Sequence, residues 1–338
     1  MKITRTVLAS LAVLGAMLPL GNGSAQEPHR AITEIAENLY RAENAGHRAV
    51  FLVTDEGVIL ADTINRGFSE WLKNEIDQRF GVPVRYVLYS HHHWDHASGG
   101  GVFDDTATFI AQENMLRHLE LPSANTPLSG AAAEQDANGD GRLQESEASG
   151  MFAQFFSLFD ENADGSLSGA EVAWGRLADV RAPDLVFKDR MTVTLGGSEA
   201  EIIHVGQMTH TLDMSVIHFP EQRAVFAVDF FSVGRLPFRT LNQGPLNEWL
   251  NAIRAVEMLD VDVVVTGHGF VGDLSDVAAH RRYIEELRDL VAAGIERGAT
   301  VEELQAEILM EPYQDWLNYS DFRAQNVEGM YRILTEQQ

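Results

Sequence analysis

The stretch Ser90-His91-His92-His93-Trp94-Asp95-His96 puts four imidazoles and one carboxylate into seven residues, directly after the mostly apolar run 84–89. If that run is a strand followed by a sharp loop, the alternate residues His91 and His93 can point to one side. Asp95 and His96 then continue round a second centre, and all four are ligand types for transition metals. The stretch therefore predicts a metal site with room for two adjacent ions.

The residues around this stretch predict an α/β fold. Apolar residues recur at a spacing of four from Phe68 to Phe80, which indicates an amphipathic helix. Gly81-Val82-Pro83 ends this helix and leads into the strand that delivers the histidines. A further strand at 107–111 and a helix at 112–121 are expected before the regular alternation stops. Loops at strand ends are where functional sites usually lie.

The spacing His-x-His-x-Asp-His resembles the signature of the metallo-β-lactamase-fold (glyoxalase-II-like) hydrolases. The resemblance covers roughly residues 33–120 and 182–335. It implies a four-layer αββα sandwich with metal ions at the sheet edges, which we expect to occupy residues 26–121 and 182–338. Residues 122–181 have a different composition and are expected to form an insertion.

The resemblance also implies the remaining ligands, each placed after a predicted strand. Gly206 to Thr211 is similar to the family turn that carries the third histidine of the first site, and Asp229 and His268 follow two later apolar runs. One ion would then be bound by His91, His93 and His210. The other would be bound by Asp95, His96 and His268, with Asp229 bridging the two.

The chemistry expected of such a centre is hydrolysis. The chain has no cysteine, so any metal must be bound by nitrogen and oxygen; zinc is the default, with iron or manganese as alternatives. Two ions can generate a bridging hydroxide at neutral pH and polarise an ester, lactone, thioester or lactam. Asp95 would then be both a ligand and the catalytic acid/base residue.

The substrate is expected to be a small molecule. The apolar stretch 230–238 contains Arg235 and is followed by Arg239, which suits a partly hydrophobic substrate that carries an anion. Core packing with two exposed arginines explains the same pattern equally well.

Two twelve-residue loops in the insertion match the EF-hand calcium loop. Oxygen ligands at positions one, three and five, glycine at six and glutamate at twelve are what a seven-coordinate calcium ion requires, with a backbone carbonyl from position seven. Loop 1 (136–147) offers Asp136, Asn138, Asp140, Arg142 and Glu147, and loop 2 (160–171) offers Asp160, Asn162, Asp164, Ser166 and Glu171. Two calcium ions are therefore expected.

The two loops are expected to form a compact pair. Leu143 and Leu167 occupy the positions at which paired EF-hand loops exchange backbone hydrogen bonds, and residues 148–159 are expected to form one short connecting helix. The entering segment 126–130 is a poor helix former, which departs from the usual helix-loop-helix pattern. We expect calcium here to be structural.

The first 25 residues have the layout of a secretory signal. Lys2 and Arg5 precede an uncharged apolar run from Val7 to Leu20, and small residues end at Ala25. A membrane anchor is the alternative, but the run is short of the roughly 20 residues that span a bilayer. We therefore expect export to a periplasm or secretion, with no membrane span after cleavage.

The charge of the chain argues against nucleic acid as a partner. The formal net charge is −25, and it becomes −27 when Lys2 and Arg5 are removed with the signal. A phosphate backbone requires a basic stripe, and this surface would repel it. The sequence does not indicate an oligomeric state.

Two functions of other classes remain open. The same fold can hold iron in an oxidoreductase of the sulfur-dioxygenase kind, and metal analysis would distinguish this reading. Alternatively, the EF-hand pair is a calcium-dependent binding module on a hydrolase scaffold. The complete set of candidate metal ligands argues against the binding-module alternative, because a site that no longer had a catalytic function could lose its ligands.

Overall fold

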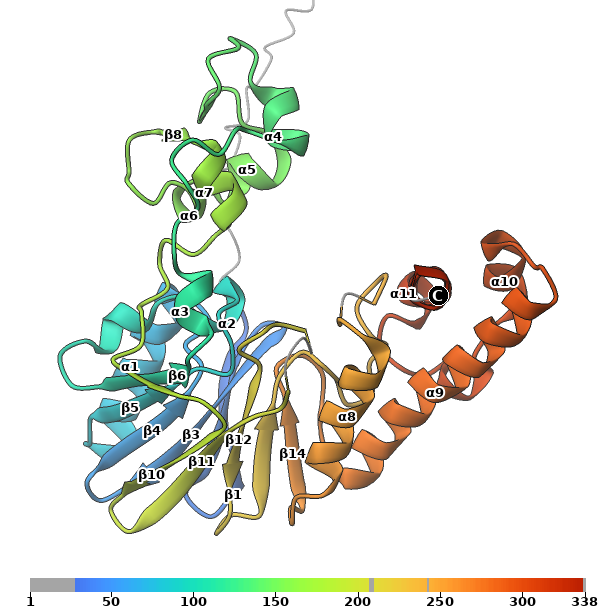
Figure 1. Cartoon of the computed structure of the whole chain (residues 1–338). Coiled ribbons are helices and arrows are strands. Elements are labelled where there is room, and N and C mark those ends of the chain that lie inside the picture. The colour runs from blue at the N-terminus through green and yellow to red at the C-terminus, as the bar shows by residue number, and fades with distance from the viewer. Residues whose placement is uncertain (1–27, 207–209, 242, 337–338) are drawn as a thin grey trace, which may run out of the picture.

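The structure is a computed structural model that describes residues 28–206, 210–241 and 243–336. The predicted signal peptide, residues 1–25, lies outside the described residues. Two β-sheets face each other, with helices on their outer faces and a small separate lobe above one end (Figure 1).

The first sheet has seven strands in the order β1-β2-β3-β4-β5-β6-β9, and β4, β5, β6 and β9 pair in parallel. Its strands are β1 (Arg30–Ala36), β2 (Leu39–Asn44), β3 (His47–Thr54), β4 (Gly57–Ala61), β5 (Val84–Leu88), β6 (Thr108–Gln112) and β9 (Leu185–Phe187). The second sheet has six strands in sequence order, and only its β13–β14 pair is parallel. Its strands are β10 (Arg190–Leu195), β11 (Ser198–His204), β12 (Ser215–Phe219), β13 (Ala224–Ala227), β14 (Val263–Thr266) and β15 (Val271–Gly272).

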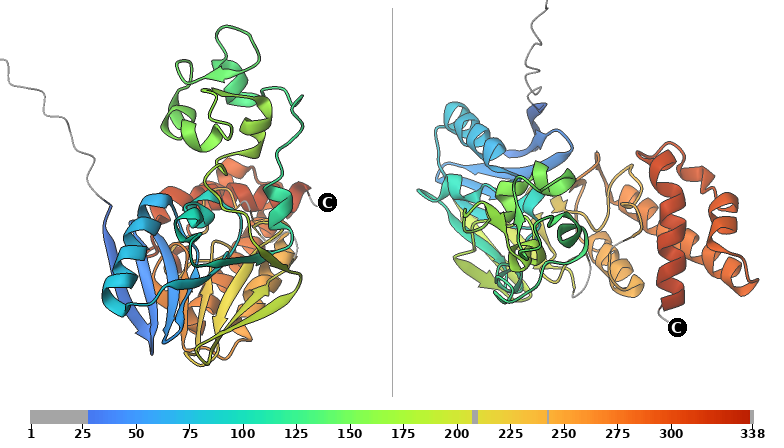
Figure 2. Two further views of the ribbon diagram at one scale, coloured as in Figure 1. Left: turned by 90° about the vertical axis from the view of Figure 1, so that its left-hand side faces the viewer. Right: turned by 90° about the horizontal axis from the view of Figure 1, so that it is seen from above.

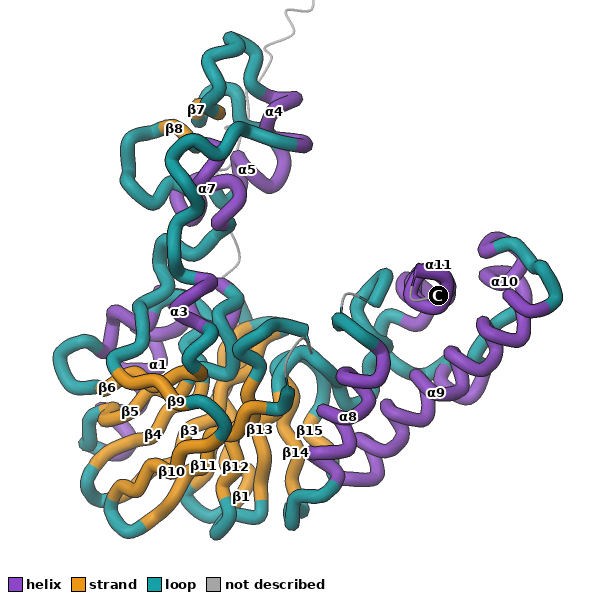
Figure 3. The backbone as a smooth tube through the Cα atoms, in the orientation of Figure 1, coloured by secondary structure: helices purple, strands orange, loops and turns teal. Residues whose placement is uncertain are grey.

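Helices flank the sheets and make up most of the C-terminal region (Figure 3). The helices of the two sheet halves are α1 (Arg66–Phe80), α2 (Trp94–Ala97), η1 (Gly100–Phe103), α3 (Met115–His118), α8 (Leu246–Glu257), α9 (Leu274–Glu296), α10 (Val301–Glu307), η2 (Glu311–Tyr313) and α11 (Tyr319–Glu336). The lobe contains α4 (Gly130–Gln135), β7 (Leu143–Gln144), α5 (Gly150–Gln154), α6 (Phe156–Phe159), β8 (Ser166–Leu167) and α7 (Gly169–Trp174).

Three layers of buried side chains separate four layers of secondary structure. Phe68, Leu72 and Ile76 of α1 pack on the outer face of the first sheet. Leu52 and Ile59 meet residues of β11 and β12 between the two sheets. The outer face of the second sheet packs against α8 and α9, as the two further views also indicate (Figure 2). The predicted αββα sandwich is thus present.

The apolar spacing that predicted α1 is the cause of this packing. Residues four apart lie on one face of a helix, and here that face is buried. Asn65 caps the helix by accepting from the Phe68 amide, and Gly81 ends it with a positive φ of 67°.

The insert, residues 122–181, leaves the sandwich between β6 and β9 and forms the lobe (Figure 1). β7 and β8 pair antiparallel with Leu143 opposite Leu167, which is the pairing expected of the two loops. Six apolar residues of the insert form one buried cluster: Ala132, Leu143, Phe152, Phe156, Phe159 and Leu167.

Two sequence-based helix predictions were wrong. The expected helix over 148–159 is divided into α5 and α6, because Phe155 leaves the helical region with φ −122° and ψ 24°. The expected helix over 112–121 is reduced to the four residues of α3. A capping box of Thr300 and Glu303 starts α10. No described helix is both long and apolar enough to cross a membrane.

Candidate metal centre

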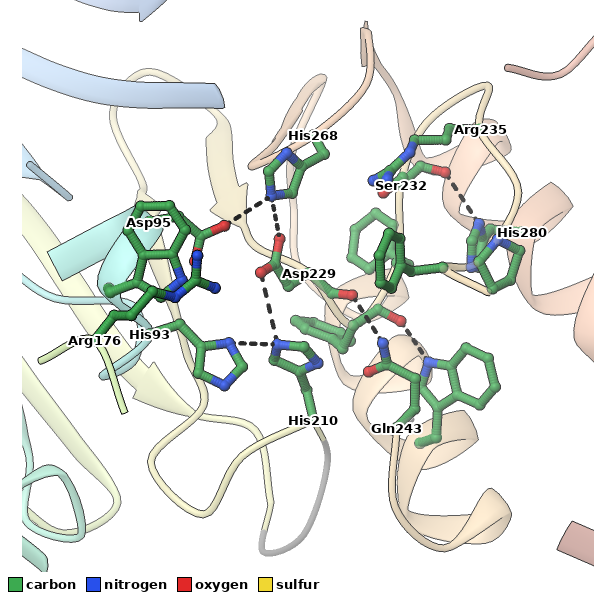
Figure 4. Close-up of a pocket in the computed structure, with 16 residues that line it drawn as sticks. His93, Asp95, Arg176, His210, Asp229, Ser232, Arg235, Gln243, His268 and His280 are labelled. Carbon is green, nitrogen blue, oxygen red and sulfur yellow. Dashed lines mark hydrogen bonds and ion pairs between the residues drawn. The ribbon is translucent and has the colours of Figure 1, made fainter. Parts of the chain in front are cut away.

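The seven predicted ligands of the dinuclear centre converge at one edge of the two sheets. The motif 90–96 follows β5, Asp229 follows β13, His268 follows β14, and His210 lies in the loop between β11 and β12. All of these loops leave strands at the same edge, so residues more than 170 positions apart become neighbours (Figure 4).

The first group contains His91, His93, His210 and Asp229. One nitrogen or oxygen atom from each lies within 4.8 Å of the others. Asp229 Oδ2 is 3.6 Å from both His91 Nε2 and His210 Nε2, and His93 Nδ1 is 3.1 Å from His210 Nε2. An ion bound at about 2.0–2.1 Å keeps its ligand atoms within about 4.2 Å of one another, so these distances fit a single ion.

The second group contains His96, His268 and Asp229. His96 Nε2 is 3.3 Å from His268 Nε2 and 3.1 Å from Asp229 Oδ2, and His268 Nε2 is 3.3 Å from Asp229 Oδ1. Asp95 Oδ2 lies farther out, at 4.0 Å from His96 Nε2 and 3.9 Å from His268 Nε2. Asp95 can thus complete the second group at its outer edge.

Asp229 is the residue common to both groups, and its backbone is held in an unusual conformation. Its φ is 61°, a left-handed value that non-glycine residues adopt rarely and at a cost. Gln243 Nε2 donates a hydrogen bond of 3.2 Å to the Asp229 carbonyl. This arrangement turns the carboxylate between the histidines of the two groups.

A buried aspartate orients two of the imidazoles. Asp62 accepts from the amide and hydroxyl of Ser90 at 2.8 and 2.7 Å, and Ser90 Oγ is 3.0 Å from His91 Nδ1. Asp62 Oδ2 also lies 3.3 Å from His96 Nδ1. Both rings thereby keep Nε2 directed toward Asp229, the orientation that a second partner on a metal-binding histidine typically enforces.

The electrostatics keep most of the imidazoles neutral, as a metal ligand must be. Burial, together with neighbouring histidines, lowers the pKa of His93 to about 3, and burial lowers the pKa of His268 to about 4. Burial alone would raise the pKa of Asp229, but His96 and His268 lower it well below its usual range. His96 is the exception: burial would lower its pKa, but Asp229 and Asp62 raise it well above its usual value. The other four imidazoles of the centre are neutral nitrogens around a carboxylate.

Buried polar atoms without partners support this reading. His91 Nε2 and Asp229 Oδ1, both directed into the centre, are buried and make no hydrogen bond with the described residues. Two pairs of imidazole nitrogens face each other at 3.1 and 3.3 Å, which is unfavourable for bare lone pairs but expected for two ligands of one cation. The donor set thus fits a bound transition metal.

Sequence reasoning missed His47, which contacts the outer residue of the second group. His47 Nε2 is 3.2 Å from Asp95 Oδ2, and its ring lies edge-on to His268 with centroids 4.6 Å apart. Burial raises the pKa of Asp95, but the His47 hydrogen bond and the charge of His96 reverse this, so the net shift is downward. His47 begins β3, far from the motif, so no local pattern could have indicated it.

His92, the remaining histidine of the motif, points to a different cluster. Its Nδ1 is 2.9 Å from Asp213 Oδ1, and its ring stacks on His118 at 3.7 Å with an interplanar angle of 3°. Parallel rings cannot both direct in-plane lone pairs at one ion between them. The arrangement instead ties the motif to α3 and to the loop before β12.

A cleft of about 600 Å³ opens over the two groups (Figure 4). It is lined by His93, Trp94, Asp95, Arg176, His210, Asp229, Phe230, Phe231, Ser232, Arg235, Pro237, Phe238, Gln243, Trp249, His268 and His280. One side of it is therefore the apolar stretch 230–238 with Arg235, as the sequence suggested; Arg239 does not line it. Arg176, from the insert, was not foreseen.

The family model of the metallo-beta-lactamase superfamily matches residues 45–268, which include all seven residues of the centre. The chain belongs to that superfamily. The members of this superfamily are mostly hydrolases, and they typically bind two metal ions. No curated protein matches the chain.

Solved structures of the metallo-beta-lactamase superfamily share the fold at low sequence identity. A metallo-beta-lactamase from Pontibacter korlensis is 18% identical with a TM-score of 0.53, and the match covers 76% of this chain and 99% of that one. The metallo-beta-lactamase DIM-1 is 15% identical with a TM-score of 0.52, covering 77% and 98%. The inverting sec-alkylsulfatase Pisa1 from Pseudomonas sp. is 16% identical with a TM-score of 0.59; the match covers 90% of this chain but only half of the sulfatase.

Proposed function

We propose that this protein is an exported, dinuclear metal hydrolase that cleaves an ester, lactone, thioester or lactam bond in a small molecule. The observation that carries the proposal is the position of Asp229, whose Oδ2 lies within 3.6 Å of imidazoles from both groups. A carboxylate shared in this way is expected where two ions lie side by side.

The ligand assignment follows the two groups. His91, His93 and His210 would hold the first ion, Asp95, His96 and His268 the second, and Asp229 both. Zinc suits these nitrogen and oxygen donors. Two bound ions would supply a nucleophile at neutral pH and polarise the scissile bond.

The side chains of this site divide the remaining work. Asp95 is ionised and partly exposed to the cleft, so it can accept a proton from the attacking water and return it to the leaving group. His47 holds the Asp95 carboxylate in place. Phe230, Phe231 and Phe238 line one side of the cleft and would keep water away from that side of a bound substrate.

Loops 1 and 2 would each bind a structural calcium ion. Backbone amides close both loops around inward-facing oxygens: Gly141 N donates to Asp136 Oδ2 at 2.9 Å, and Gly165 N donates to Asp160 Oδ2 at 3.0 Å. Free calcium outside the cytoplasm is high enough to fill even weak EF-hand sites. The signal-like residues 1–25 support export, which fractionation of cells expressing the full chain would test.

The decisive experiment combines metal analysis, a substrate panel and one variant. Purified mature protein should contain close to two zinc ions per chain and should cleave at least one chromogenic ester, thioester, lactone, lactam or alkyl sulfate. Asp95→Asn should fold normally but lose about 10²–10⁴-fold in kcat, because the amide cannot accept a proton.

Three results would count against the proposal. Full activity of Asp95→Asn would remove the catalytic role of Asp95. A protein with no bound transition metal at pH 7 would remove the metal centre. Bound iron with oxygen consumption and no hydrolysis would favour the oxidoreductase alternative.

A further inference from the structure

Arg176 is the one described residue of the insert that lines the cleft above the metal centre. It follows α7 by two positions, after Gly175, which has a positive φ of 90°. Figure 4 places its guanidinium beside Asp95 and His93, on the opposite side of the metal-site residues from Arg235. The insert therefore reaches the site through this side chain.

Two aromatic rings hold the Arg176 guanidinium. Its carbon Cζ lies 3.8 Å from the centroid of Trp94, which belongs to the metal motif, and 4.7 Å from the centroid of Phe155, which belongs to the insert. The two rings are themselves 5.3 Å apart. Cation–π contacts of this kind fix the position of the charge but leave its N–H groups available.

Arg176 forms no ion pair in the described chain, unlike other arginines of the same segment, although the carboxylate of Asp95 acts on its charge at longer range. Arg181 pairs with Asp104 and Asp184, and Arg142 pairs with Asp164. Among the described residues, Arg176 makes neither a hydrogen bond nor an ion pair. A half-buried guanidinium with five free donors is costly unless a ligand supplies an acceptor.

Arg235 repeats this arrangement across the cleft. It stacks over Phe238 and Phe322 at 5.9 Å each and also forms no ion pair within the described chain. In a protein with a net charge of −25, the cleft thus contains two cations without an ion pair among the described residues, and the carboxylates that act on them at longer range, Asp95 and Asp229, are themselves candidate metal ligands. The two cations indicate that the cleft receives an anionic group in addition to the bond that is cleaved.

Loop 2 lies between Phe155 and Arg176, the two insert residues that stack with Trp94. Phe155 precedes α6, which ends where loop 2 begins, and Arg176 follows α7, which begins inside loop 2. The insert has a core of only six buried residues, so its shape depends on additional ties. A metal ion that links the two ends of loop 2 is such a tie.

Glu171, at position twelve of loop 2, provides independent support for a cation in this loop. It is only 3% exposed; Oε2 caps α7 through Ser168, at 2.8 Å from its amide and 2.7 Å from its hydroxyl. The other oxygen, Oε1, is buried with no partner in the described chain. A buried carboxylate oxygen without a donor is expected to face a cation.

We infer that Arg176 is a specificity-determining residue that binds an anionic group of the substrate, and that calcium in loop 2 holds it in place over Trp94. This inference rests on the hydrolase function and the calcium loops proposed above. It makes the insert part of the substrate site instead of a remote lobe.

A binding measurement tests the arginine independently of turnover. The probe is 1-hexanesulfonate, a weak ligand for zinc, with neutral hexyl methyl sulfone as its counterpart, titrated calorimetrically into zinc- and calcium-loaded protein. Arg176→Gln should weaken sulfonate binding about tenfold and leave sulfone binding unchanged, and Arg176→Lys should restore part of the loss. Arg117→Gln, which removes an exposed charge on α3 outside the cleft, is the matched control.

Turnover gives a second readout if the protein is a hydrolase. Arg176→Gln should raise KM about tenfold for the 4-nitrophenyl monoester of adipate, with kcat and zinc content unchanged, but should not alter KM for neutral 4-nitrophenyl hexanoate. Absence of turnover with intact, Arg176-dependent sulfonate binding would contradict the proposed function and leave the inference standing. Equal effects on the charged and neutral ligands, or no effect on either, would overturn it.

The calcium link requires its own arm. In zinc-loaded protein freed of calcium, added calcium should strengthen sulfonate binding in the parent and in Glu161→Gln, which removes a charge at a non-ligating position of loop 2. The response should be lost in Glu171→Gln, which retains the helix cap, and in Arg176→Gln, which lacks the group that calcium positions. Calcium binding that leaves sulfonate affinity unchanged in the parent would show that loop 2 does not hold Arg176.

Discussion

The contact of His47 with Asp95 shows how single residues outside the metal motif set its geometry. A carboxylate at the outer edge of the second group could adopt several rotamers. The 3.2 Å contact with His47 Nε2 selects the one that points toward His268 and His96. Asp62 does the same for the ring of His96 directly and for the ring of His91 through the hydroxyl of Ser90.

We therefore predict that His47→Phe lowers kcat about 10–100-fold while the zinc content stays near two and KM changes little, because Asp95 loses its orientation. His47→Gln, which retains an N–H donor, should lose less. His218→Phe breaks a similar 2.9 Å contact with Glu201 on the second sheet, away from the centre, and should leave kcat unchanged. If His47→Phe loses zinc in proportion to activity, His47 is a ligand and not a positioning residue.

At the scale of elements, the buried His280 of α9 contacts the segment that forms the wall of the cleft through the backbone carbonyl of Ser232. His280 is 1% exposed, its Nδ1 lies 3.0 Å from the Ser232 carbonyl, and its ring stacks on Trp316 at 5.9 Å. Burial lowers the pKa of His280 to about 4; the Ser232 contact opposes this shift, and the charge of Arg235 adds to it. The imidazole of His280 is therefore neutral in the folded protein at neutral pH.

This lowered pKa predicts a loss of stability in mild acid. An unfolded histidine binds its proton near pH 6.5, but folded His280 binds it only near pH 4, so between these values the unfolded chain holds more protons. The stabilisation is fully present above pH 6.5 and falls as the pH drops toward 4, by about 2 kcal/mol between pH 7 and pH 5.

Urea unfolding of zinc-saturated protein at both pH values would check this prediction. In His280→Gln the loss between pH 7 and pH 5 should be smaller than in the parent by about 2 kcal/mol, since the candidate metal ligands are the same in both proteins. Identical losses in the two proteins would show that His280 does not titrate in this range.

At the scale of the whole molecule, the protein consists of a two-sheet sandwich with large hydrophobic cores and an inserted lobe with a small hydrophobic core. The sandwich buries three extensive apolar layers, whereas the apolar cluster of the insert contains only six buried residues beside the acids of two loops. Ties between them include Arg66 to Asp179 at 2.9 Å and the stack of Arg176 on Trp94. The two parts should therefore differ in their dependence on calcium.

We predict that Glu147→Gln combined with Glu171→Gln makes residues 122–181 sensitive to protease at calcium concentrations that protect the parent, while the sandwich stays folded. Without calcium, repulsion among the loop carboxylates loosens a lobe that has little core to oppose it. Limited proteolysis with mass spectrometry locates the cuts. Glu145→Gln with Glu161→Gln removes the same charge from non-ligating positions and should behave as the parent; if calcium protects neither parent nor control, the loops are not calcium sites.

The local sequence was sufficient to predict an α/β fold, a metal motif at residues 90–96 and the pairing of the two loops, whereas the αββα sandwich was expected only from the family resemblance. Helix and strand periods, strand-end positions and loop registers depend on residues near one another in the chain, so they can be read from spacing. The family resemblance extended this to His210, Asp229 and His268, which have no local signal of their own.

Only the tertiary structure placed His47, Asp62 and Arg176 at the site. His47 meets Asp95 across 48 positions, and Arg176 meets Trp94 from the far end of an insertion. The role of each of these side chains comes from the residue that it contacts. Those contacts depend on how the two sheets pack and on where the insert lies over the cleft. The sequence alone determined which atoms could bind metal, but the packing of distant elements decided which way those atoms point and which charges face the cleft.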